Sequence, residues 1–237
     1  MTPAAYAAAI VVVAMGALLQ GSLGFGFGML ASPLLALLDR ELVPGPVLVL
    51  GLTVAAIVAW QERGALDWRG IRWALVGRVL GTFAGVAVVH RLNHDQLAMV
   101  LGTFIIVAVA LSVLGFHVAP TPRTLVGAGA VSGLMGTLTS IGGPPMALVY
   151  QREQAARLRS TLAGFFLFGA GFALASLVVA GEVRGAELRD GLLLLPGLVI
   201  GLVGCRWVGR FLDRGWTRPA VLALCLAAAV VLIVDAW

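Results

Sequence analysis

Two glycine-rich stretches carry most of the polar groups in an otherwise apolar part of the chain. The first runs from Gln20 to Pro33 and the second from Ser132 to Pro145. Each lies inside a long apolar run, where several glycines favour a break in a helix because each costs roughly 1 kcal/mol relative to alanine. A break inside a membrane is stable only where protein or a cavity surrounds the freed backbone groups. Two such segments at matching places in two halves indicate a transport site.

The chemistry expected at these breaks is the binding of an anion. A helix that begins at a break presents free N–H groups and the positive end of its dipole, which bind an anion without a charged side chain. Nearby hydroxyl and amide groups add donors. The residues predicted to bind substrate in this way are Gln20, Ser22, Gly24, Gly26, Gly28, Thr137, Thr139, Ser140, Gly142 and Gly143. The alternative is that the glycines only allow helices to pack closely.

Arg78 is the further candidate for the site. It lies several residues inside an apolar segment, and an ionisable residue at such a depth is a functional candidate. The alternative is that its side chain reaches toward the nearby interface, as we expect for Arg206. No Asp or Glu lies in the middle of an apolar segment, so an anion is a better ligand than a cation. The sequence shows no metal-ligand spacing and no catalytic cluster, so we expect neither enzyme activity nor a cofactor.

The composition indicates a helical membrane protein with several spans. The chain has 237 residues, of which 60% are hydrophobic and 11% are charged, and its mean hydropathy is +1.02. All sixteen basic residues are Arg, and almost all lie between apolar segments. That placement is typical of loops that set membrane orientation, and it argues against a nucleic-acid partner. The expected partners are a lipid bilayer and a small anionic substrate.

The elements that must position these residues form two related halves. A proline-containing polar link near residue 117 divides the chain into an N-terminal repeat, 1–117, and a C-terminal repeat, 118–237. Each repeat has four apolar segments and opens with the glycine-broken one. Gly21-x-x-Gly24 aligns with Gly133-x-x-Gly136 at one constant offset. The predicted fold is therefore an all-α integral membrane protein built from two four-segment repeats.

The distribution of loop arginines favours an inverted arrangement of the repeats. If every segment crosses once, six arginines lie on one side and eight on the other. If both broken segments enter and return on the same side, ten share one side and four the other. The four are Arg40, Arg91, Arg184 and Arg189. The stronger asymmetry favours two re-entrant segments, each with two short half-helices, and it places both termini outside.

The glycine motifs resemble those of the TauE/SafE sulfite-exporter family. The resemblance rests on the duplicated motif, on its second copy Ser-Ile-Gly-Gly-Pro-Pro-Met at 140–146, and on Gly-Arg-Phe-Leu at 209–212. It implies a multi-pass carrier of the bacterial inner membrane for sulfite or small organosulfonates such as sulfoacetate. The family motifs map to Gly24, Gly26, Gly28 and Pro33, and to Gly136, Gly142, Gly143 and Pro144. Here Phe25 and Phe27 interleave the first motif, which favours an organic sulfonate.

The predicted function is a secondary transporter of a small sulfur-containing anion that works by alternating access, with the two halves rocking around the site. One alternative is an anion channel of the same architecture. Another is a membrane protein that assists an assembly without transport. The last apolar segment, residues 219–234, could face lipid or a second protomer of a homodimer.

Overall fold

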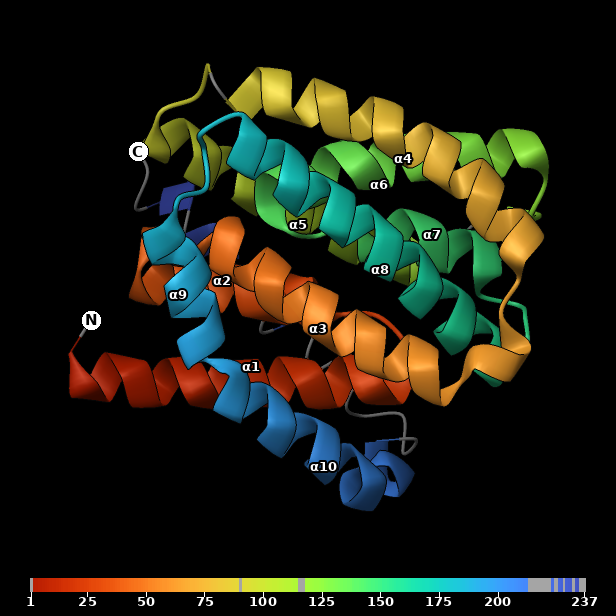
Figure 1. Ribbon diagram of the computed structural model, residues 1–237, viewed down its shortest axis with the longest axis horizontal. Coiled ribbons are helices and arrows are strands. Elements are labelled where there is room, and N and C mark those ends of the chain that lie inside the picture. Colours follow the sequence, from red (N-terminus) through yellow and green to blue (C-terminus); the bar gives the residue numbers. More distant parts are fainter. Residues whose placement is uncertain are drawn as a thin grey trace.

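The computed structural model describes residues 2–89, 91–114 and 118–212, together with isolated residues between 223 and 234. Within these residues the chain is helical and contains no strand (Figure 1). The α-helices are α1 (Pro3–Leu23), α2 (Phe27–Leu38), α3 (Gly45–Gln61), α4 (Trp68–Val89), α5 (His94–Leu114), α6 (Pro122–Thr139), α7 (Gly143–Tyr150), α8 (Ala155–Val179), α9 (Gly185–Leu193) and α10 (Leu195–Leu212). The last predicted segment falls mostly outside the described residues.

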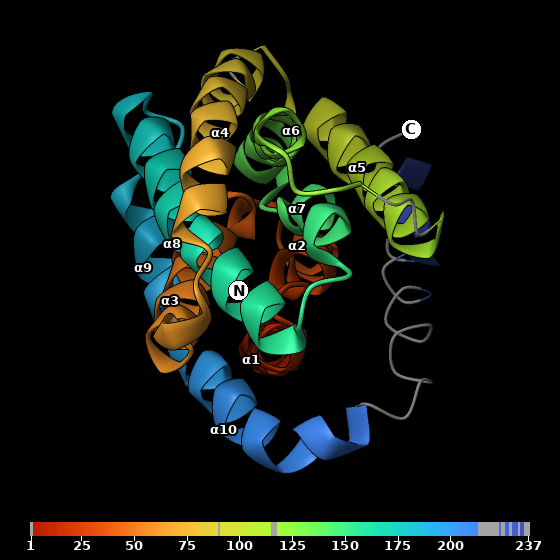
Figure 2. The same cartoon turned by 90° about the vertical axis from the view of Figure 1, so that its right-hand side faces the viewer.

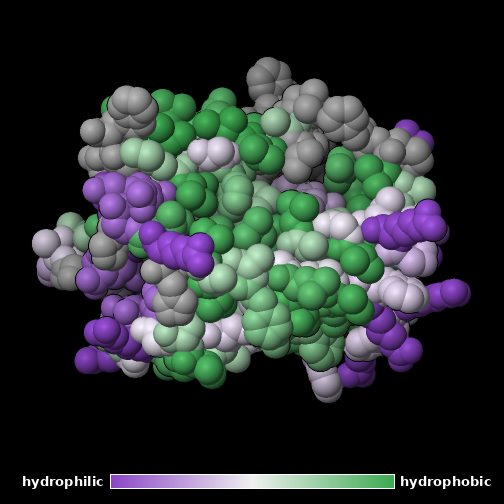
Figure 3. Space-filling model, turned by 90° about the horizontal axis from the view of Figure 1, so that it is seen from above, coloured by the Kyte–Doolittle hydropathy of each residue, from purple (hydrophilic) through white to green (hydrophobic). Residues whose placement is uncertain are grey.

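Five stretches are long and apolar enough to cross a membrane. They are Pro3–Leu23, Arg40–Gln61, Trp68–Val89, Ala155–Val179 and Gly185–Cys205. Seen from above, hydrophilic residues gather at the two ends of the long axis and hydrophobic residues form the band between them (Figure 3). This distribution confirms the predicted helical membrane protein with several spans.

Both glycine-rich stretches interrupt helices. In the first, Gly24 and Gly26 have φ values of 85° and 108°, which only glycine adopts readily. In the second, Ser140 caps α6 with a φ of 61°, and Gly142 precedes α7. The prediction of two short half-helices at each break was wrong. The first arms have 21 and 18 residues, whereas α2 and α7 have 12 and 8. At 1.5 Å per residue, α1 is about 31 Å long, which is enough to span a bilayer.

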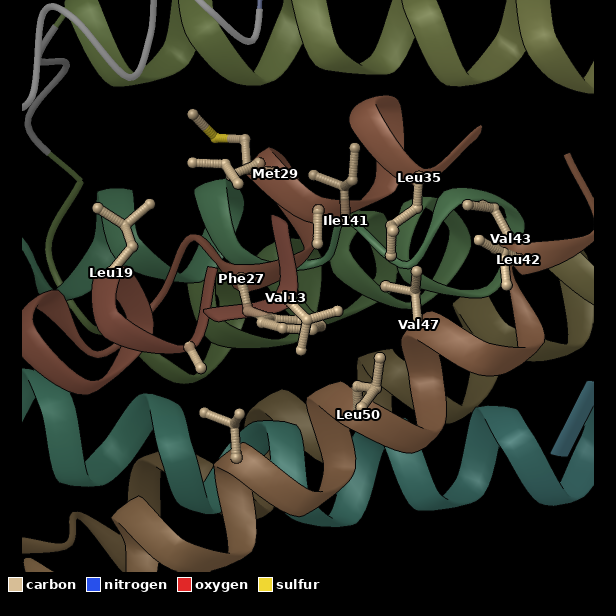
Figure 4. Packing of buried hydrophobic residues seen from close by; sticks show 14 of the residues in the cluster. Val13, Leu19, Phe27, Met29, Leu35, Leu42, Val43, Val47, Leu50 and Ile141 are labelled. Carbon is tan, nitrogen blue, oxygen red and sulfur yellow. The ribbon is translucent and has the colours of Figure 1, made fainter. Parts of the chain in front are cut away.

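The short arms α2 and α7 lie at the centre of the molecule, with the longer helices around them (Figure 2). A cluster of buried hydrophobic residues surrounds α2, and Figure 4 shows part of it. Phe27 and Leu35 of α2 lie there beside Val13 of α1 and Val47 of α3. Because α2 is enclosed by protein rather than lipid, its broken N-terminal end is stable at this depth.

The most extensive helix pairs join the two predicted repeats. They are α4 with α6, α1 with α10, and α3 with α8. A Cβ atom on Gly77 or Gly81 of α4 would lie 1.9 or 2.0 Å from a carbonyl oxygen of α6. A Cβ atom on Gly197 or Gly201 of α10 would lie 2.5 or 2.1 Å from a carbonyl oxygen of α1. These glycines, spaced four residues apart in each helix, therefore let the backbones of the paired helices touch.

The residues that flank each broken stretch lie near one another. Thr2, just before α1, and Asp39, just after α2, line the same surface pocket at one end of the molecule. At the other end, Leu125 near the start of α6 packs in one cluster with Tyr150 at the end of α7. The start of α3 contacts α9 at the first end, since a Cβ atom on Gly45 would lie 3.4 Å from Cβ of Glu187. The end of α3 leads to the loop in which Asp67 accepts from Tyr150, at the opposite end of that helix.

Candidate functional site

A cavity of about 50 Å³ lies where the two breaks meet. That volume has room for a few water molecules and is therefore large enough for the headgroup of a small oxyanion. Seven of the eleven predicted site residues line it. They are Gln20, Gly26, Gly28, Arg78, Ser140, Gly142 and Gly143. Phe27 and Phe166 form part of the apolar wall, whereas Phe25 packs in a neighbouring hydrophobic cluster.

The two breaks touch each other at Gly28. A Cβ atom on this glycine would lie 2.1 Å from the carbonyl oxygen of Ser140. The hydroxyl of Ser140 donates to the carbonyl of Pro44 over 3.0 Å, which ties the second break to the start of α3. Glycine at position 28 is therefore required for the close approach of the two backbones.

The short helix α2 presents backbone donors to the cavity. Its first intrahelical bond runs from the N–H of Leu30 to the carbonyl of Gly26 over 3.1 Å. The N–H groups of Phe27, Gly28 and Met29 precede that bond, and all three residues line the cavity. Free N–H groups and the positive end of the helix dipole together favour an anion at this position.

The short helix α7 offers fewer donors than the sequence led us to expect. Its first three residues are Gly143, Pro144 and Pro145, and proline has no backbone N–H. Only Gly143 can donate from this first turn. The two breaks are therefore chemically different, although both were predicted to contribute backbone donors in the same way.

Arg78 supplies a positive charge on the α7 side of the cavity. It is 2% exposed and is the one charged residue among the described residues that is buried. Its Nη1 donates to Oγ of Ser132 over 2.9 Å, and its Cζ lies 5.0 Å from the centroid of the Phe165 ring. Its buried Nε has no hydrogen-bond partner in the part of the chain that the structure describes. The guanidinium therefore faces the interior of the protein and does not reach toward an interface.

Ser132 is a site residue that the sequence reasoning missed. Its hydroxyl accepts from Arg78 and donates to the carbonyl of Gly142, so it joins α4 to the second break. The signal that could have found it is the buried arginine itself, because a guanidinium in a membrane needs an acceptor nearby. Gln20 also lines the cavity, and its side chain makes no hydrogen bond to the described part of the chain.

Four predicted residues lie away from the cavity. The hydroxyls of Ser22, Thr137 and Thr139 donate to carbonyls four residues earlier in their own helices. Ser22 also contacts Sγ of Cys205 at 3.3 Å. Gly24 packs against Arg159, since a Cβ atom there would lie 2.6 Å from Cα of that residue. The structure thus concentrates the candidate site on seven predicted residues and Ser132. The side chain of Arg206 lies outside the described residues.

An ionic cluster closes one end of the molecule next to these elements. Arg159, which touches Gly24, pairs with Glu62 at 2.8 Å. Asp67 accepts from the hydroxyl of Tyr150 at 3.0 Å and pairs with Arg157 at 3.3 Å. Burial alone would raise the pKa of Asp67, but hydrogen bonds from the Gly70 N–H, Tyr150 and Arg157 outweigh it and lower the pKa. The cluster ties the ends of α1 and α7 to the loop between α3 and α4.

Comparison with protein families assigns the chain. The family model described as sulfite exporter TauE/SafE matches residues 8–232, which is nearly the whole chain. The chain belongs to this family. The match confirms the family resemblance read from the glycine motifs, and it indicates a membrane transporter of sulfur anions. Searches of curated proteins and of solved structures found no match.

Proposed function

We propose that this TauE/SafE member is a secondary transporter that moves a small sulfur-containing anion across the bacterial inner membrane by alternating access. The observation that carries the proposal is the buried charge of Arg78 in the cavity between two broken helices. No Asp or Glu is among the described residues that line this cavity. The local charge therefore favours an anion over a cation.

The bound anion has two kinds of donor in this proposal. Free N–H groups of Phe27, Gly28 and Met29 approach it from the start of α2, and the guanidinium of Arg78 approaches it from the side of α7. Charge-assisted hydrogen bonds from a guanidinium to an oxyanion are about twice as strong as neutral ones. The phenyl ring of Phe27 supports an organic sulfonate, whose apolar part could rest on it.

Two inverted, re-entrant repeats form the architecture of this proposal. The caps of the breaks correspond, since Gly24 ends α1 as Ser140 ends α6, and Gly26 precedes α2 as Gly142 precedes α7. The caps thus pair Gly24 with Ser140, whereas the sequence alignment paired Gly24 with Gly136. The alignment of the two repeats therefore needs to be shifted by about one helical turn. The pairing of α4 with α6 corresponds to that of α10 with α1. In Figure 1, α1 and α6 run in opposite directions, as do α4 and α10.

The contacts at the two ends support the ten-against-four distribution of arginines. Arg40 pairs with Asp95 at 2.6 Å, which joins the end of α2 to the start of α5. At the opposite end, the ionic cluster joins the α3–α4 loop to the start of α8. The loop arginines of that second end outnumber those of the first, so this end faces the cytoplasm in our proposal.

Ligand-dependent thermal stability of the detergent-purified protein tests the site. The panel is sulfite, sulfate, thiosulfate, sulfoacetate, taurine and acetate. An anion that binds the folded state raises the apparent melting temperature by mass action. We expect sulfite or sulfoacetate to do so selectively, and Arg78→Gln to weaken that effect at least about tenfold. Arg72→Gln is the matched control, because Arg72 lies on the same helix and is exposed. Equal effects of the two variants would contradict the proposed site.

Flux measurements in proteoliposomes distinguish the possible activities. A carrier gives saturable uptake and counterflow of labelled sulfite or sulfoacetate, whereas a channel gives conductance that does not saturate. A protein that only assists an assembly gives neither flux nor ligand-dependent stabilisation. We expect counterflow, and its absence together with a measurable conductance would replace the carrier by a channel.

A further inference from the structure

Three glycines surround the guanidinium of Arg78. A Cβ atom on Gly169 of α8 would lie 2.4 Å from Nε and 2.8 Å from Cζ. One on Gly136 of α6 would lie 2.9 Å from Nη2, and one on Gly142 at the second break would lie 2.8 Å from Nη1. Each nitrogen of the guanidinium therefore occupies space that a methyl group would fill.

These three glycines differ from the glycines that bring helices together. Gly77, Gly81 and Gly129 each lie against backbone atoms of the facing helix. At Gly136 and Gly169, by contrast, the nearest atoms are side-chain atoms of Arg78. At Gly142 the nearest atom is Nη1 of Arg78 at 2.8 Å, and the carbonyl oxygen and hydroxyl of Ser132 follow at 2.9 Å. Close helix packing therefore accounts for the first group and leaves the second unexplained.

The other groups that contact the guanidinium are themselves held in place by buried neighbours. Ser132 accepts the one hydrogen bond that Arg78 makes within the described residues, and Ser132 is itself held by the carbonyl of Gly142. The fully buried ring of Phe165 lies near the guanidinium. A long flexible side chain is thus confined to one place, although most of its five N–H donors have no acceptor among the described residues.

We propose that Gly136, Gly142 and Gly169, together with Ser132, are positioning residues that fix the guanidinium of Arg78 so that its unused donors meet the transported oxyanion. The proposal rests on the proposed function. It adds that affinity depends on preorganisation, because a guanidinium already held in place loses little side-chain entropy when the anion binds. At Gly136 and Gly169 glycine is required by the arginine rather than by the backbone, and at Gly142 it is required by both.

Gly169→Ala and Gly171→Ala form a matched pair that tests this proposal. Both residues lie on α8, but a Cβ atom on Gly171 would meet only a side-chain atom of Leu52 at 3.5 Å. Alanine raises the helix propensity of α8 at either position, so a purely structural role predicts no selective loss of binding. We expect Gly169→Ala to raise the sulfite or sulfoacetate concentration for half-maximal stabilisation at least about tenfold. We expect Gly171→Ala to stay within about twofold of wild type.

Ser132→Ala provides a second measurement that does not add volume. It removes the acceptor of Arg78 Nη1, and Ser176→Ala is its control because the Ser176 hydroxyl only donates to Phe172 in its own helix. We expect the half-stabilising concentration to rise for Ser132→Ala and to remain unchanged for Ser176→Ala. Binding that is lost in Gly169→Ala and Ser132→Ala, with ligand-free melting temperatures near wild type, supports the proposal.

Two outcomes would overturn the inference, and they are distinguishable. If the wild type responds to sulfite or sulfoacetate and both Gly169→Ala and Ser132→Ala respond equally well, the positioning role is wrong while the transport site remains. If the wild type responds to neither anion and shows no flux of either, the proposed function itself is wrong, and the inference fails with it.

Discussion

Arg78 carries a charge in a part of the chain where a buried charge is expensive. An ion loses several kcal/mol of hydration free energy on transfer to a low-dielectric interior. The structure compensates with one hydrogen bond that Arg78 donates to Ser132 and with the ring of Phe165, and the described residues place no carboxylate beside it. The guanidinium is therefore only partly compensated in the unliganded protein, which favours the arrival of an anion.

Asp67 is a second residue whose charge has a measurable consequence. Its pKa is lowered below 3.8 in the folded protein, so its contribution to stability is present above that pH and is lost as the pH falls through the folded value. We expect Asp67→Asn to destabilise the protein by about 1 kcal/mol at neutral pH. The difference from wild type should shrink below pH 3.8 in melting curves recorded across a pH series.

Asp95→Asn is the control for this prediction. Asp95 pairs with Arg40, but its side chain is 61% exposed. Exposed pairs contribute little to stability because solvent screens them. We expect the melting temperature of this variant to change little at any pH. An equal loss in both variants would show that the partners of Asp67 do not act as a stabilising cluster.

The sequence was sufficient to predict some residues of the site and not others. Glycines clustered in an apolar run and an arginine within a span are visible in one dimension, and Gly28 and Arg78 do line the cavity. The role of Gly169 depends on which side chain faces it from another helix. The hydroxyls of Thr137 and Thr139 were predicted from depth alone, and depth does not reveal that each bonds within its own helix.

At the scale of elements, the contact between the two breaks is the most sensitive feature. Gly28 leaves no room for a methyl group beside the carbonyl of Ser140, and a carbonyl at a helix cap cannot move like a flexible side chain. We expect Gly28→Ala to separate the breaks and abolish transport and ligand-dependent stabilisation. Counterflow and melting curves on the purified variant measure both.

Gly127→Ala is the matched control for the contact between the breaks. Gly127 lies on α6, and a Cβ atom there would have no neighbour within 4 Å. We expect transport close to wild type and an unchanged response to sulfite. If Gly28→Ala transported as well as Gly127→Ala, the breaks would not need to touch for function.

The lengths of the arms are also a property of elements, and the sequence did not predict them. The motifs located both breaks, but the expectation of two short half-helices took the glycines to lie in the middle of a crossing. In the structure α1 is long enough to cross alone before it ends at Gly24, and only α2 is short. Hydropathy marks where a segment is apolar and does not mark where a helix ends, because the arms on both sides of each break are apolar.

At the scale of the whole molecule, the proposed topology makes opposite predictions from a chain in which every segment crosses once. Gly64 and Gly185 lie at opposite ends of α3, and a Cβ atom on either would meet nothing within 4 Å. If both broken segments enter and leave the membrane on the same side, Gly64 and Gly185 face opposite sides of the membrane. If every segment crosses once, they face the same side.

Cysteine labelling in intact bacteria measures this difference. Gly64→Cys and Gly185→Cys are each made in a chain whose Cys205 and Cys225 are replaced by serine. We expect a membrane-impermeant maleimide to label Gly185→Cys from outside and to label Gly64→Cys only after the cells are opened. Equal labelling of both from outside would contradict the re-entrant hairpins. The exposed Trp60 and Trp68 beside Gly64 are typical of an interface at that end.

The close helix contacts at glycines determine which helices can move together as rigid bodies. Backbone contact along Gly77 and Gly81 fastens α4 to α6, and contact along Gly197 and Gly201 fastens α10 to α1. Each of these two helix pairs has one helix from residues 1–117 and one from residues 118–237. A rigid-body motion of one half against the other would therefore break the backbone contacts in both pairs. We expect the moving bodies to be these mixed pairs. The two repeated halves of the sequence would then not be the rigid bodies that move during transport.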